Sequence, residues 1–439
     1  MFVNRVEEIK AISKRLDSDN FEFFILYGRR RIGKTRLILE CVREREHIYY
    51  FATESANIRH FKDHCKKSIP DMAYAADDWE AIFNLLRDRI VIIDEFPNMI
   101  KEFPGIISLF QRIIDTQLSK TRTKLILLGS SISMMGQNIL SYKSPLYGRK
   151  TGVIKLGPMD FKDIRSFFPE AGWYELCEIF GLCDGVPYYL EKMRDSFWEW
   201  LQEEVSGVDS FLSYEIDFLM KYEFENFVTY KKILEAIANG KNTPVEIRNY
   251  LGMRHSDITP YLRNLMEVEF IKREIPVTEG ERSRMGRYFL KDNFLSFWFR
   301  FIYPNLSGIG EKLFSVEDIR EDHNAYVGRV FEQIAKQFVL ELNRKKMLPF
   351  GIKKLGRWWR KGEEIDLIGM NEREKKALFM EVKWRDLKAG EADKIISKLK
   401  RKSVQTSMNG YEKHYGIIAK GTEKKGTLIF DLMDFDRVF

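Results

Sequence analysis

The sequence predicts a multidomain α/β protein. Its 439 residues are too many for one hydrophobic core, so we expect three or four domains. Short apolar runs typical of buried strands occur in the first third of the chain and again near its end, with a helix-rich middle between them. An apolar fraction of 44% with 31% charged residues is typical of a folded globular protein rather than a disordered one.

The first element is an apolar strand at residues 23–27, which breaks into the phosphate-binding pattern GxxxxGKT ahead of a helix expected at 36–42. Its glycines let the backbone fold tightly, so that successive N–H groups point at phosphate oxygens near the positive end of the helix. Lys34 would reach the β- and γ-phosphates, and the Thr35 hydroxyl would be a ligand of Mg²⁺. The predicted binding residues for ATP are Gly28, Arg29, Arg30, Arg31, Ile32, Gly33, Lys34 and Thr35.

The three arginines of this loop are the one unusual feature of the pattern. They either add positive charge around the phosphates or face solvent, and we favour the second interpretation.

Two further apolar strands complete the predicted nucleotide site. Residues 90–93 lead into Asp94, which would help to hold Mg²⁺, and Glu95, which is placed to polarise the attacking water. Residues 124–129 end at Ser130 and Ser131, and their position fits a strand lying between the other two. Either serine could sense the γ-phosphate, or both could belong to a plain turn at the strand end.

Together these motifs resemble the archaeal-type AAA-related ATPases of the STAND clade. The resemblance includes residues 2–5 (FVNR), 144–149 (SPLYGR) and 185–190 (GVPYYL). It implies that the N-terminal residues pack near the adenine and that Pro187 contacts the nucleotide from a helical lid. It also implies that Arg149 faces the phosphates, either in its own subunit or across a homo-oligomer. A surface salt bridge is the alternative for Arg149.

The middle of the chain predicts a winged helix. Two of its three expected helices open with Thr-Pro pairs, at 243–244 and 259–260, and two strands then flank a charged loop at 278–285. In such a domain the third helix enters the major groove of DNA and the hairpin contacts phosphates, although other winged helices dock proteins. The candidate DNA contacts are Arg254, His255, Arg263, Arg282, Arg284 and Arg287.

An aromatic stripe follows the winged helix at helical spacing. Phe294, Phe297, Trp298 and Phe301 could stack on bases, but packing in the core is the favoured interpretation.

The last hundred residues contain a second constellation. Asp366 lies on one predicted strand, and alternation places Glu381 and Lys383 on one face of the next strand, where a hairpin would bring them to Asp366. An acid followed by ExK is the pattern of PD-(D/E)xK nucleases, in which the acids hold Mg²⁺ and the lysine stabilises developing charge. Glu332, on a helix expected to begin near residue 328, matches an additional acidic metal or water ligand of such nucleases.

The family resemblance also implies a C-terminal domain of restriction-endonuclease type, with an inactive relic as the alternative. Trp358, Trp359 and the basic residues at 394–402 either line a phosphate track or form a core edge and a solvated face. The expected domains are an ATPase core at 1–157, a helical lid at 158–222, a winged helix at 223–303, a linker at 304–324 and a nuclease-like domain at 325–439.

Composition limits the remaining possibilities. A net charge of +7 permits a polyanionic partner such as DNA without requiring one. The four cysteines form no CxxC pair and are expected to be reduced and buried, which together with the absence of a signal-peptide core predicts a cytoplasmic protein. No run approaches ~18 apolar residues, so we expect no membrane span.

These observations support three hypotheses. The first is an ATP-regulated protein that binds DNA and cleaves it with a Mg²⁺-dependent site. The second is a non-cleaving ATPase switch whose terminal domains only bind DNA or protein, and the third is an ATPase that acts in assembly alone.

Overall fold

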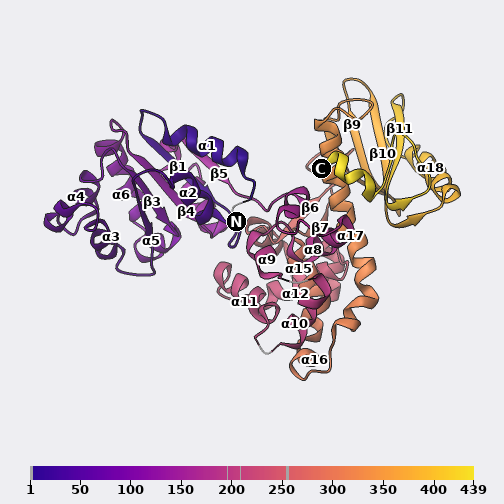
Figure 1. Cartoon of the computed structure of the whole chain (residues 1–439), viewed down its shortest axis with the longest axis horizontal. Coiled ribbons are helices and arrows are strands. Elements are labelled where there is room, and N and C mark those ends of the chain that lie inside the picture. The colour runs from indigo at the N-terminus through magenta and orange to yellow at the C-terminus, as the bar shows by residue number, and fades with distance from the viewer. Residues whose placement is uncertain (1–2, 195, 208, 254–256) are drawn as a thin grey trace. The chain divides into compact units, whose positions relative to one another are not determined.

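The structure is a computed structural model that describes residues 3–194, 196–207, 209–253 and 257–439 (Figure 1). The chain forms two compact units, each described here by itself. Unit 1 contains Met1–Pro158 together with Val186–Tyr188 and Lys221–Glu225. Unit 2 contains Met159–Gly185, Tyr189–Met220 and Asn226–Phe439.

Unit 1 is built on a five-stranded parallel sheet with the strand order β2-β3-β4-β1-β5. Its strands are β1 (Glu22–Tyr27), β2 (His47–Phe51), β3 (Ile90–Asp94), β4 (Lys124–Gly129) and β5 (Gly152–Lys155). Strand β4 is hydrogen-bonded to both β1 and β3, which confirms the position predicted for it from the sequence. Because the strands are parallel, the loops after β1, β3 and β4 emerge at the same edge of the sheet.

Helices cover both faces of this sheet because successive strand side chains point to opposite faces. On one face, Phe24, Leu26 and Ile126 pack against the first two helices. On the other face, Phe23 and Leu127 share a core with the four helices that follow. These helices are α1 (Val6–Leu16), α2 (Lys34–Val42), α3 (Asn57–Cys65), α4 (Trp79–Asn84), α5 (Phe96–Glu102) and α6 (Ile106–Ile113).

Helices make up most of the first part of unit 2, and they are held to the long helix α17 (Val316–Arg344). The buried Tyr326 hydroxyl donates to the carbonyl oxygens of Gly181 (2.6 Å) and Asn293 (3.0 Å). These bonds join α17 to both α8 and α15. The preceding helices are α8 (Trp173–Cys183), α10 (Phe197–Ser206) and α15 (Asn293–Phe297), together with α9 (Pro187–Lys192), whose start belongs to unit 1, and α11 (Phe211–Glu223), whose end belongs to unit 1.

Three helices and an antiparallel hairpin follow one another in the region where a winged helix is expected. They are α12 (Val228–Ala238), α13 (Pro244–Tyr250), α14 (Thr259–Glu267), β6 (Ile271–Glu274) and β7 (Arg287–Leu290). Thr243 closes a capping box with Glu246 at the start of α13, which is the local reason that the Thr-Pro pair opens a helix.

The C-terminal part of unit 2 is a mixed five-stranded sheet with the order β12-β11-β10-β9-β8. Strands β8, β9 and β10 form an antiparallel meander, and β11 returns parallel to β10 after the crossover helix α18 (Ala389–Ser403). The strands are β8 (Lys354–Arg360), β9 (Glu363–Asn371), β10 (Lys376–Leu387), β11 (Glu412–Thr422) and β12 (Ile429–Phe430). A last short helix, α19 (Phe435–Val438), packs against α17.

Aromatic packing explains why α17 and the C-terminus belong to the same unit as residues 159–185. Phe338 of α17 lies 4.8 Å from the Phe435 ring, and Phe161 lies 5.6 Å from the Phe439 ring, centroid to centroid. The stripe of Phe294, Phe297, Trp298 and Phe301 is buried, which confirms the core interpretation over base stacking.

The structure differs from the expected linker at 304–324. Helix α16 (Leu306–Gly310) lies in that range, and α17 begins at Val316 rather than near residue 328. The cause is a capping box between Ser315 and Asp318, whose side chains satisfy the N–H groups that the first turn of a helix leaves unpaired.

Two compositional expectations can be compared with the described part of the chain. Cys41, Cys65, Cys177 and Cys183 are all free and buried, as expected. Among the described residues, none of the helices combines the length and the apolar character that crossing a bilayer requires.

The first prediction concerns the packing of α17. Replacing Phe338 by alanine should lower the free energy of unfolding of unit 2 by about 3–5 kcal/mol, because the fully buried ring leaves a cavity among other aromatic side chains. Leu340→Ala on the same helix is the matched control and should cost less, since its side chain is 37% exposed. Urea unfolding followed by circular dichroism would measure both; equal losses for the two variants would contradict the assigned packing.

Candidate functional site

The loop after β1 has the backbone that a phosphate-binding loop needs. Gly28 has φ +154° and would place a Cβ only 2.3 Å from the carbonyl oxygen of Leu156, so a side chain cannot be accommodated there. Gly33 has φ +91°, in the region that glycine adopts without strain, and caps α2. Pro187 lies 3.9 Å from where a Cβ of Gly33 would stand, so the predicted lid residue does reach the loop.

Lys34 is buried inside this loop. Its Nζ donates to the carbonyl oxygens of Gly28 (2.9 Å) and Arg29 (3.1 Å). Burial lowers the pKa of Lys34 to about 8, although Glu95 and Asp94 act in the opposite direction. The side chain is therefore held within the loop and is close to losing its proton at mildly alkaline pH.

Asp94, at the end of β3, is bonded to the loop as the predicted Mg²⁺ site requires. The Thr35 hydroxyl donates to Asp94 Oδ2 (2.5 Å), and the Tyr49 hydroxyl donates to the same oxygen (2.9 Å). Burial raises the pKa of Tyr49, and Asp94 raises it further. The Thr35 hydroxyl and the Asp94 carboxylate are hard oxygen donors side by side, which suits Mg²⁺.

Glu95 is held in a strained position by two hydroxyl groups. Its φ is +52°, in the left-handed region, where it begins α5. The Tyr222 hydroxyl donates to Glu95 Oε2 (2.9 Å), and the Ser130 hydroxyl donates to Oε1. Sequence analysis missed Tyr222, and also Tyr49, because neither residue belongs to a recognisable motif.

The two serines after β4 have different partners. Ser130 binds Glu95, whereas Ser131 caps α7 (Ile132–Met134) and donates to Glu223 Oε2 (3.1 Å), which also accepts from Ser133 (3.0 Å). Burial raises the pKa of Glu223, and the serine hydroxyls lower it. Ser130 is thus the serine that lies beside the candidate catalytic carboxylate.

The favoured interpretation of the three loop arginines was wrong for two of them. The Arg30 guanidinium lies 3.9 Å from the centroid of the Tyr222 ring, and the Arg31 guanidinium lies 3.8 Å from that of Tyr188. All three arginines are partly buried. The positive charges and the negative faces of the tyrosine rings attract each other, which packs the loop against the two short pieces of chain that join unit 1 late in the sequence.

Arg149 adopts the alternative arrangement, a surface salt bridge. Its Nε and Nη2 donate to the two carboxylate oxygens of Asp115 (2.7 and 2.6 Å), and Nη1 donates to the Pro145 carbonyl (2.8 Å). This bidentate pairing with Asp115 occupies the Arg149 guanidinium in this structure.

The C-terminal sheet brings Asp366, Glu381 and Lys383 together. Asp366 is on β9 and the other two are on β10, where Leu367 pairs with Met380 in the antiparallel register. Lys383 Nζ lies 2.9 Å from Glu381 Oε1 and 3.7 Å from Asp366 Oδ2. Asp366 Oδ2 also accepts from the backbone N–H of Val382 (2.8 Å).

The Glu381 carboxylate raises the energy of the charged form of Asp366. Burial raises the pKa of Asp366, and the neighbouring Glu381 raises it further. Burial alone would lower the pKa of Lys383, but Asp366 and Glu381 outweigh it, so that its pKa is raised. Glu381 Oε2 is buried and makes no hydrogen bond to any described residue, and its nearest cation is the Lys402 ammonium at 3.7 Å.

Glu332 does not complete the expected set of three acidic metal ligands. Its Oε2 is ion-paired with Arg357 (3.2 Å), and within the described ranges no three His, Cys, Asp or Glu side chains are placed to hold one metal ion. Burial raises the pKa of Glu332 to about 7, and Arg357 acts against that rise. Glu332 as a metal ligand therefore stays a prediction, and Arg357, which belongs to no recognisable motif, is the residue that pairs with its carboxylate here.

The basic residues near this site are of two kinds. Lys402 is buried, donates to the Glu364 carbonyl oxygen (2.6 Å) and lies 3.7 Å from Glu381 Oε2, whereas Lys394, Lys398 and Lys400 are exposed. Trp358 and Trp359 are both buried, and Trp358 belongs to the core of the sheet. The two tryptophans therefore form a core edge rather than a phosphate track.

The β6–β7 hairpin is docked on this sheet. Val277 N–H donates to the Arg357 carbonyl (2.8 Å), and Trp359 Nε1 donates to the Met285 carbonyl (3.1 Å). Arg287 is ion-paired with Glu364. Of the candidate DNA contacts, Arg287 is therefore engaged in an ion pair. The exposed candidates are Arg263, Arg282 and Arg284. The remaining two, Arg254 and His255, lie outside the described residues.

Comparison with known proteins places these sites in a family. Residues 2–193 match the family described as an ATPase domain predominantly from Archaea, and residues 298–395 match one described as archaeal and bacterial proteins of unknown function. The uncharacterized protein MJECL04 of Methanocaldococcus jannaschii is 59% identical over 438 residues, which cover 99% of this chain and 100% of that protein. The uncharacterized ATP-binding protein MJ0423 of the same organism is 50% identical over 38 residues, 9% of this chain and 64% of that protein.

One solved structure supports the fold. A Walker-type ATPase of Pyrococcus abyssi, paby2304, is similar with a TM-score of 0.53 and 21% identity, covering 68% of this chain and 96% of that one. At this identity the likeness concerns the fold alone.

The buried Lys34 generates the second prediction. ATP phosphates bind the protonated ammonium, so ATP affinity should fall by about tenfold between pH 7 and pH 9 as a group with a pKa of about 8 loses its proton. Isothermal titration calorimetry at several pH values would measure this change. Lys34→Arg is the control, because a guanidinium stays charged throughout and its weaker binding should not vary with pH. A wild-type affinity that is constant to pH 9 would contradict the assigned protonation.

Proposed function

This chain belongs to the same family as the Methanocaldococcus jannaschii protein MJECL04, and on that premise we propose that it is an ATPase whose nucleotide state controls a nucleic-acid-cleaving site in the C-terminal sheet. The observation that carries the cleavage half is the meeting of Asp366, Glu381 and Lys383 on two adjacent strands. DNA is the proposed substrate and partner.

In the ATPase half, the residues of the loop and of β3 have distinct roles. The backbone N–H groups after Gly28 and the Lys34 ammonium bind the β- and γ-phosphates. Thr35 and Asp94 would hold Mg²⁺, which screens the phosphate charge when bound. Glu95 orients the attacking water once its carboxylate is turned toward the γ-phosphate.

We infer that Tyr222 restrains Glu95. The carboxylate accepts hydrogen bonds from Tyr222 and Ser130 on its two oxygens, and each bond stabilises its present orientation. Arg30 lies over the same tyrosine ring, so Tyr222 contacts both the phosphate-binding loop and the catalytic carboxylate. A nucleotide that displaces Arg30 would therefore also loosen the restraint on Glu95.

The third prediction tests this restraint. Tyr222→Phe should raise kcat for ATP hydrolysis, by up to about tenfold if the lost bond contributes ~1.4 kcal/mol to the barrier, with ATP affinity little changed. Tyr214→Phe, an exposed tyrosine on the same helix α11, is the matched control and should leave kcat unchanged. Glu95→Gln should keep nucleotide binding and reduce turnover by about 10²–10⁴-fold. A phosphate-release assay measures all three, and a fall in kcat for Tyr222→Phe would overturn the restraint.

In the cleavage half, the geometry favours a hydrolytic role for the sheet. Asp366 and Glu381 would hold a divalent cation through their oxygen atoms; Glu381 Oε2 accepts no hydrogen bond from any described residue, and the Lys402 ammonium lies 3.7 Å from it. When bound, the cation would polarise the scissile phosphate and lower the pKa of a coordinated water. Lys383, whose ammonium lies between both carboxylates, would stabilise negative charge that develops on the phosphate oxygens.

The fourth prediction concerns cleavage. Wild-type protein with Mg²⁺ or Mn²⁺ should cut linear, circular or single-stranded DNA, and the rate should differ with and without ATP. Asp366→Ala and Lys383→Ala should each reduce cleavage by about 10²-fold or more, since each removes a group that acts on the transition state. Asp386→Ala, a carboxylate further along β10 that pairs with Lys420, is the matched control and should cut normally. No cutting under any condition, or equal cutting by all variants, would overturn the cleavage proposal.

A second function is favoured by the missing third acid. Because Glu332 is paired with Arg357, the site has two carboxylates rather than three, which suits a non-cleaving switch that only binds DNA or protein. Salt-dependent DNA binding through the exposed Arg263, Arg282 and Arg284, without cleavage, would support this alternative.

A further inference from the structure

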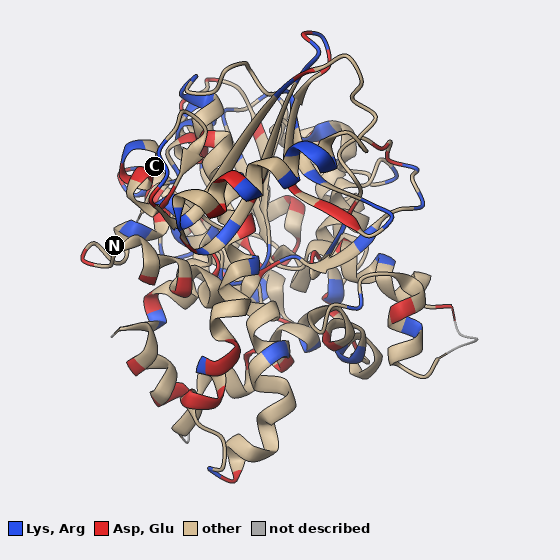
Figure 2. Cartoon of the chain, turned by 90° about the vertical axis from the view of Figure 1, so that its right-hand side faces the viewer, with Lys and Arg blue, Asp and Glu red and all other residues tan. Residues whose placement is uncertain are grey.

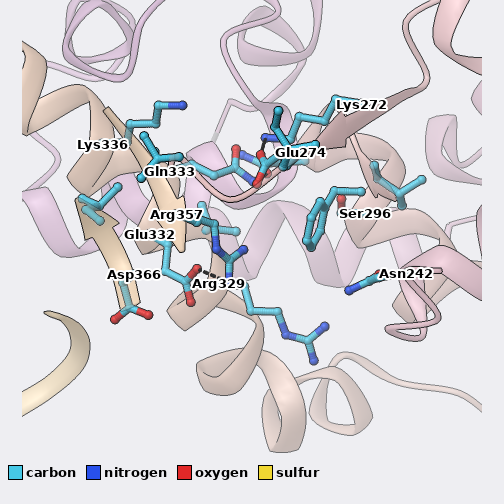
Figure 3. A pocket seen from close by; sticks show the side chains of 18 of the residues that line it. Asn242, Lys272, Glu274, Ser296, Arg329, Glu332, Gln333, Lys336, Arg357 and Asp366 are labelled. Atoms are coloured by element: carbon cyan, nitrogen blue, oxygen red, sulfur yellow. Dashed lines mark hydrogen bonds and ion pairs between the residues drawn. The ribbon is translucent and has the colours of Figure 1, made fainter. Parts of the chain in front are cut away.

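Unit 2 contains a cavity of about 750 Å³ that opens beside the Asp366 strand (Figure 3). Its walls come from the β6–β7 hairpin, helices α15 and α17, and strands β8 and β9. Glu332 and Asp366 both line it, so the cavity is continuous with the candidate cleavage site. A volume of this size suits a ligand of a few ring systems rather than a macromolecular surface.

The charges in the middle of the cavity are paired. Arg357 is ion-paired with Glu332 (3.2 Å), and Lys272 Nζ lies 2.8 Å from Glu274 Oε1. Figure 3 shows both pairs, that of Lys272 and Glu274 above that of Arg357 and Glu332. The opposite charges within each pair neutralise each other. The charge that a ligand meets therefore depends on the residues around these pairs.

Two cations of α17 line the same cavity without an anionic partner. Arg329 and Lys336 make no hydrogen bond or ion pair with any described residue, and Figure 3 shows them on either side of Glu332. Burial lowers the pKa of each, and Arg300, another residue of the wall, lowers that of Arg329 further. Both residues are nevertheless exposed to solvent, so an anion that enters the cavity can reach their charges.

Their spacing selects the kind of anion. Arg329 and Lys336 are seven residues apart on one helix, which separates them by about 10 Å along its axis at a rise of 1.5 Å per residue. Figure 3 shows the ends of the two side chains apart, with Glu332 between them, so a ligand that contacts both charges in this arrangement has at least two anionic groups. Val277, Phe289 and Leu355 provide apolar wall between the charged positions, and such surfaces accept the faces of bases.

The charge is also local rather than general. Lys and Arg positions are interspersed with Asp and Glu positions along the ribbon in the view of Figure 2. An anionic strand would therefore gain most binding free energy at Arg329 and Lys336, cations of the cavity that have no ion pair with any described residue.

We propose that this cavity binds a short single-stranded segment of nucleic acid, with its phosphates on Arg329 and Lys336 and a base against the apolar wall. The inference rests on the proposed cleavage function, for which it names the substrate class. A single nucleic-acid strand that enters the cavity along α17 would run with its sugar-phosphate backbone past Glu332 toward Asp366. Paired and stacked bases do not fit a space of this size, so the cavity discriminates a free end, a loop or a frayed duplex from continuous double strands.

The fifth prediction measures binding apart from chemistry. All proteins carry Lys34→Ala to silence the ATP site, and the buffer contains EDTA and no nucleotide. A short fluorescein-labelled oligothymidylate is titrated by anisotropy against the same oligonucleotide annealed to its complement. The parent protein should bind the single strand at least about tenfold more tightly than the duplex.

Arg329→Ala/Lys336→Ala should weaken single-strand binding by about tenfold or more and reduce the slope of log affinity against log salt by about 1.4, since two phosphate contacts are lost. Arg329→Gln/Lys336→Gln should behave alike while keeping polar side chains of similar length, and thermal unfolding of both shows whether they fold. The matched control, Lys10→Ala/Lys14→Ala, removes two exposed charges from α1 and should bind normally.

Each outcome distinguishes the inference from the cleavage proposal. Unchanged affinity in both double variants, equal affinity for single strand and duplex, or no binding to the parent protein would overturn the cavity assignment even if DNA is cut. Specific binding of the single strand, without any cleavage by the wild-type chain, would support the cavity as a binding site and contradict the cleavage proposal instead.

Discussion

The aromatic burial of helix α17 is the constraint on which unit 2 depends. Tyr326, Phe331 and Phe338 all lie on the buried side of the helix, where they contact α8, the C-terminal sheet and α19. Because the helix has 3.6 residues per turn, fixing these three residues also fixes where Arg329, Glu332 and Lys336 project. The same hydrophobic packing that stabilises the unit therefore orients the charged side chains of the cavity.

A second constraint is electrostatic and lies between two strands. Asp366 and Glu381 are carboxylates brought close by an antiparallel register, and such pairs are unfavourable unless positive charge compensates. Lys383 provides most of that charge, and Lys402 and Arg357 lie just outside it. The β6–β7 hairpin adds to this arrangement, because it fixes the backbone carbonyl of Arg357 and the side chain of Trp359 from the other side. Stability and chemistry at this site rest on the same set of charges.

The sequence was most informative where a backbone conformation or a strand period dictates residue types. The loop at Gly28–Thr35 needs glycine and lysine at fixed spacing, so its fold, its following helix and the strand order around it were all predictable. Alternation on β9 and β10 likewise predicted that Asp366 would meet Glu381 and Lys383. In both cases local geometry determines the site.

The missed contacts come from residues distant in the chain. Tyr222 reaches Glu95 across 127 positions, and Arg357 takes the carboxylate of Glu332, yet neither side chain is part of a motif. The same limit explains Arg30 and Arg31, whose tyrosine partners are supplied by chain segments that only the tertiary fold brings to the loop. The range of the expected linker contains helix α16 and the start of α17, because the capping box at Ser315 begins a helix there.

The dual use of α17 has a consequence for how this family can change over time. Inserting or deleting one residue between Arg329 and Phe338 would turn one end of the helix by about 100° relative to the other, so the aromatic and charged sets could not both keep their partners. A substitution within the helix changes the contacts of one residue, whereas a change in its length displaces a whole set of residues. Variation in length is instead expected in the turn at residues 345–353 and in the loop at 278–286, where no such phase has to be kept.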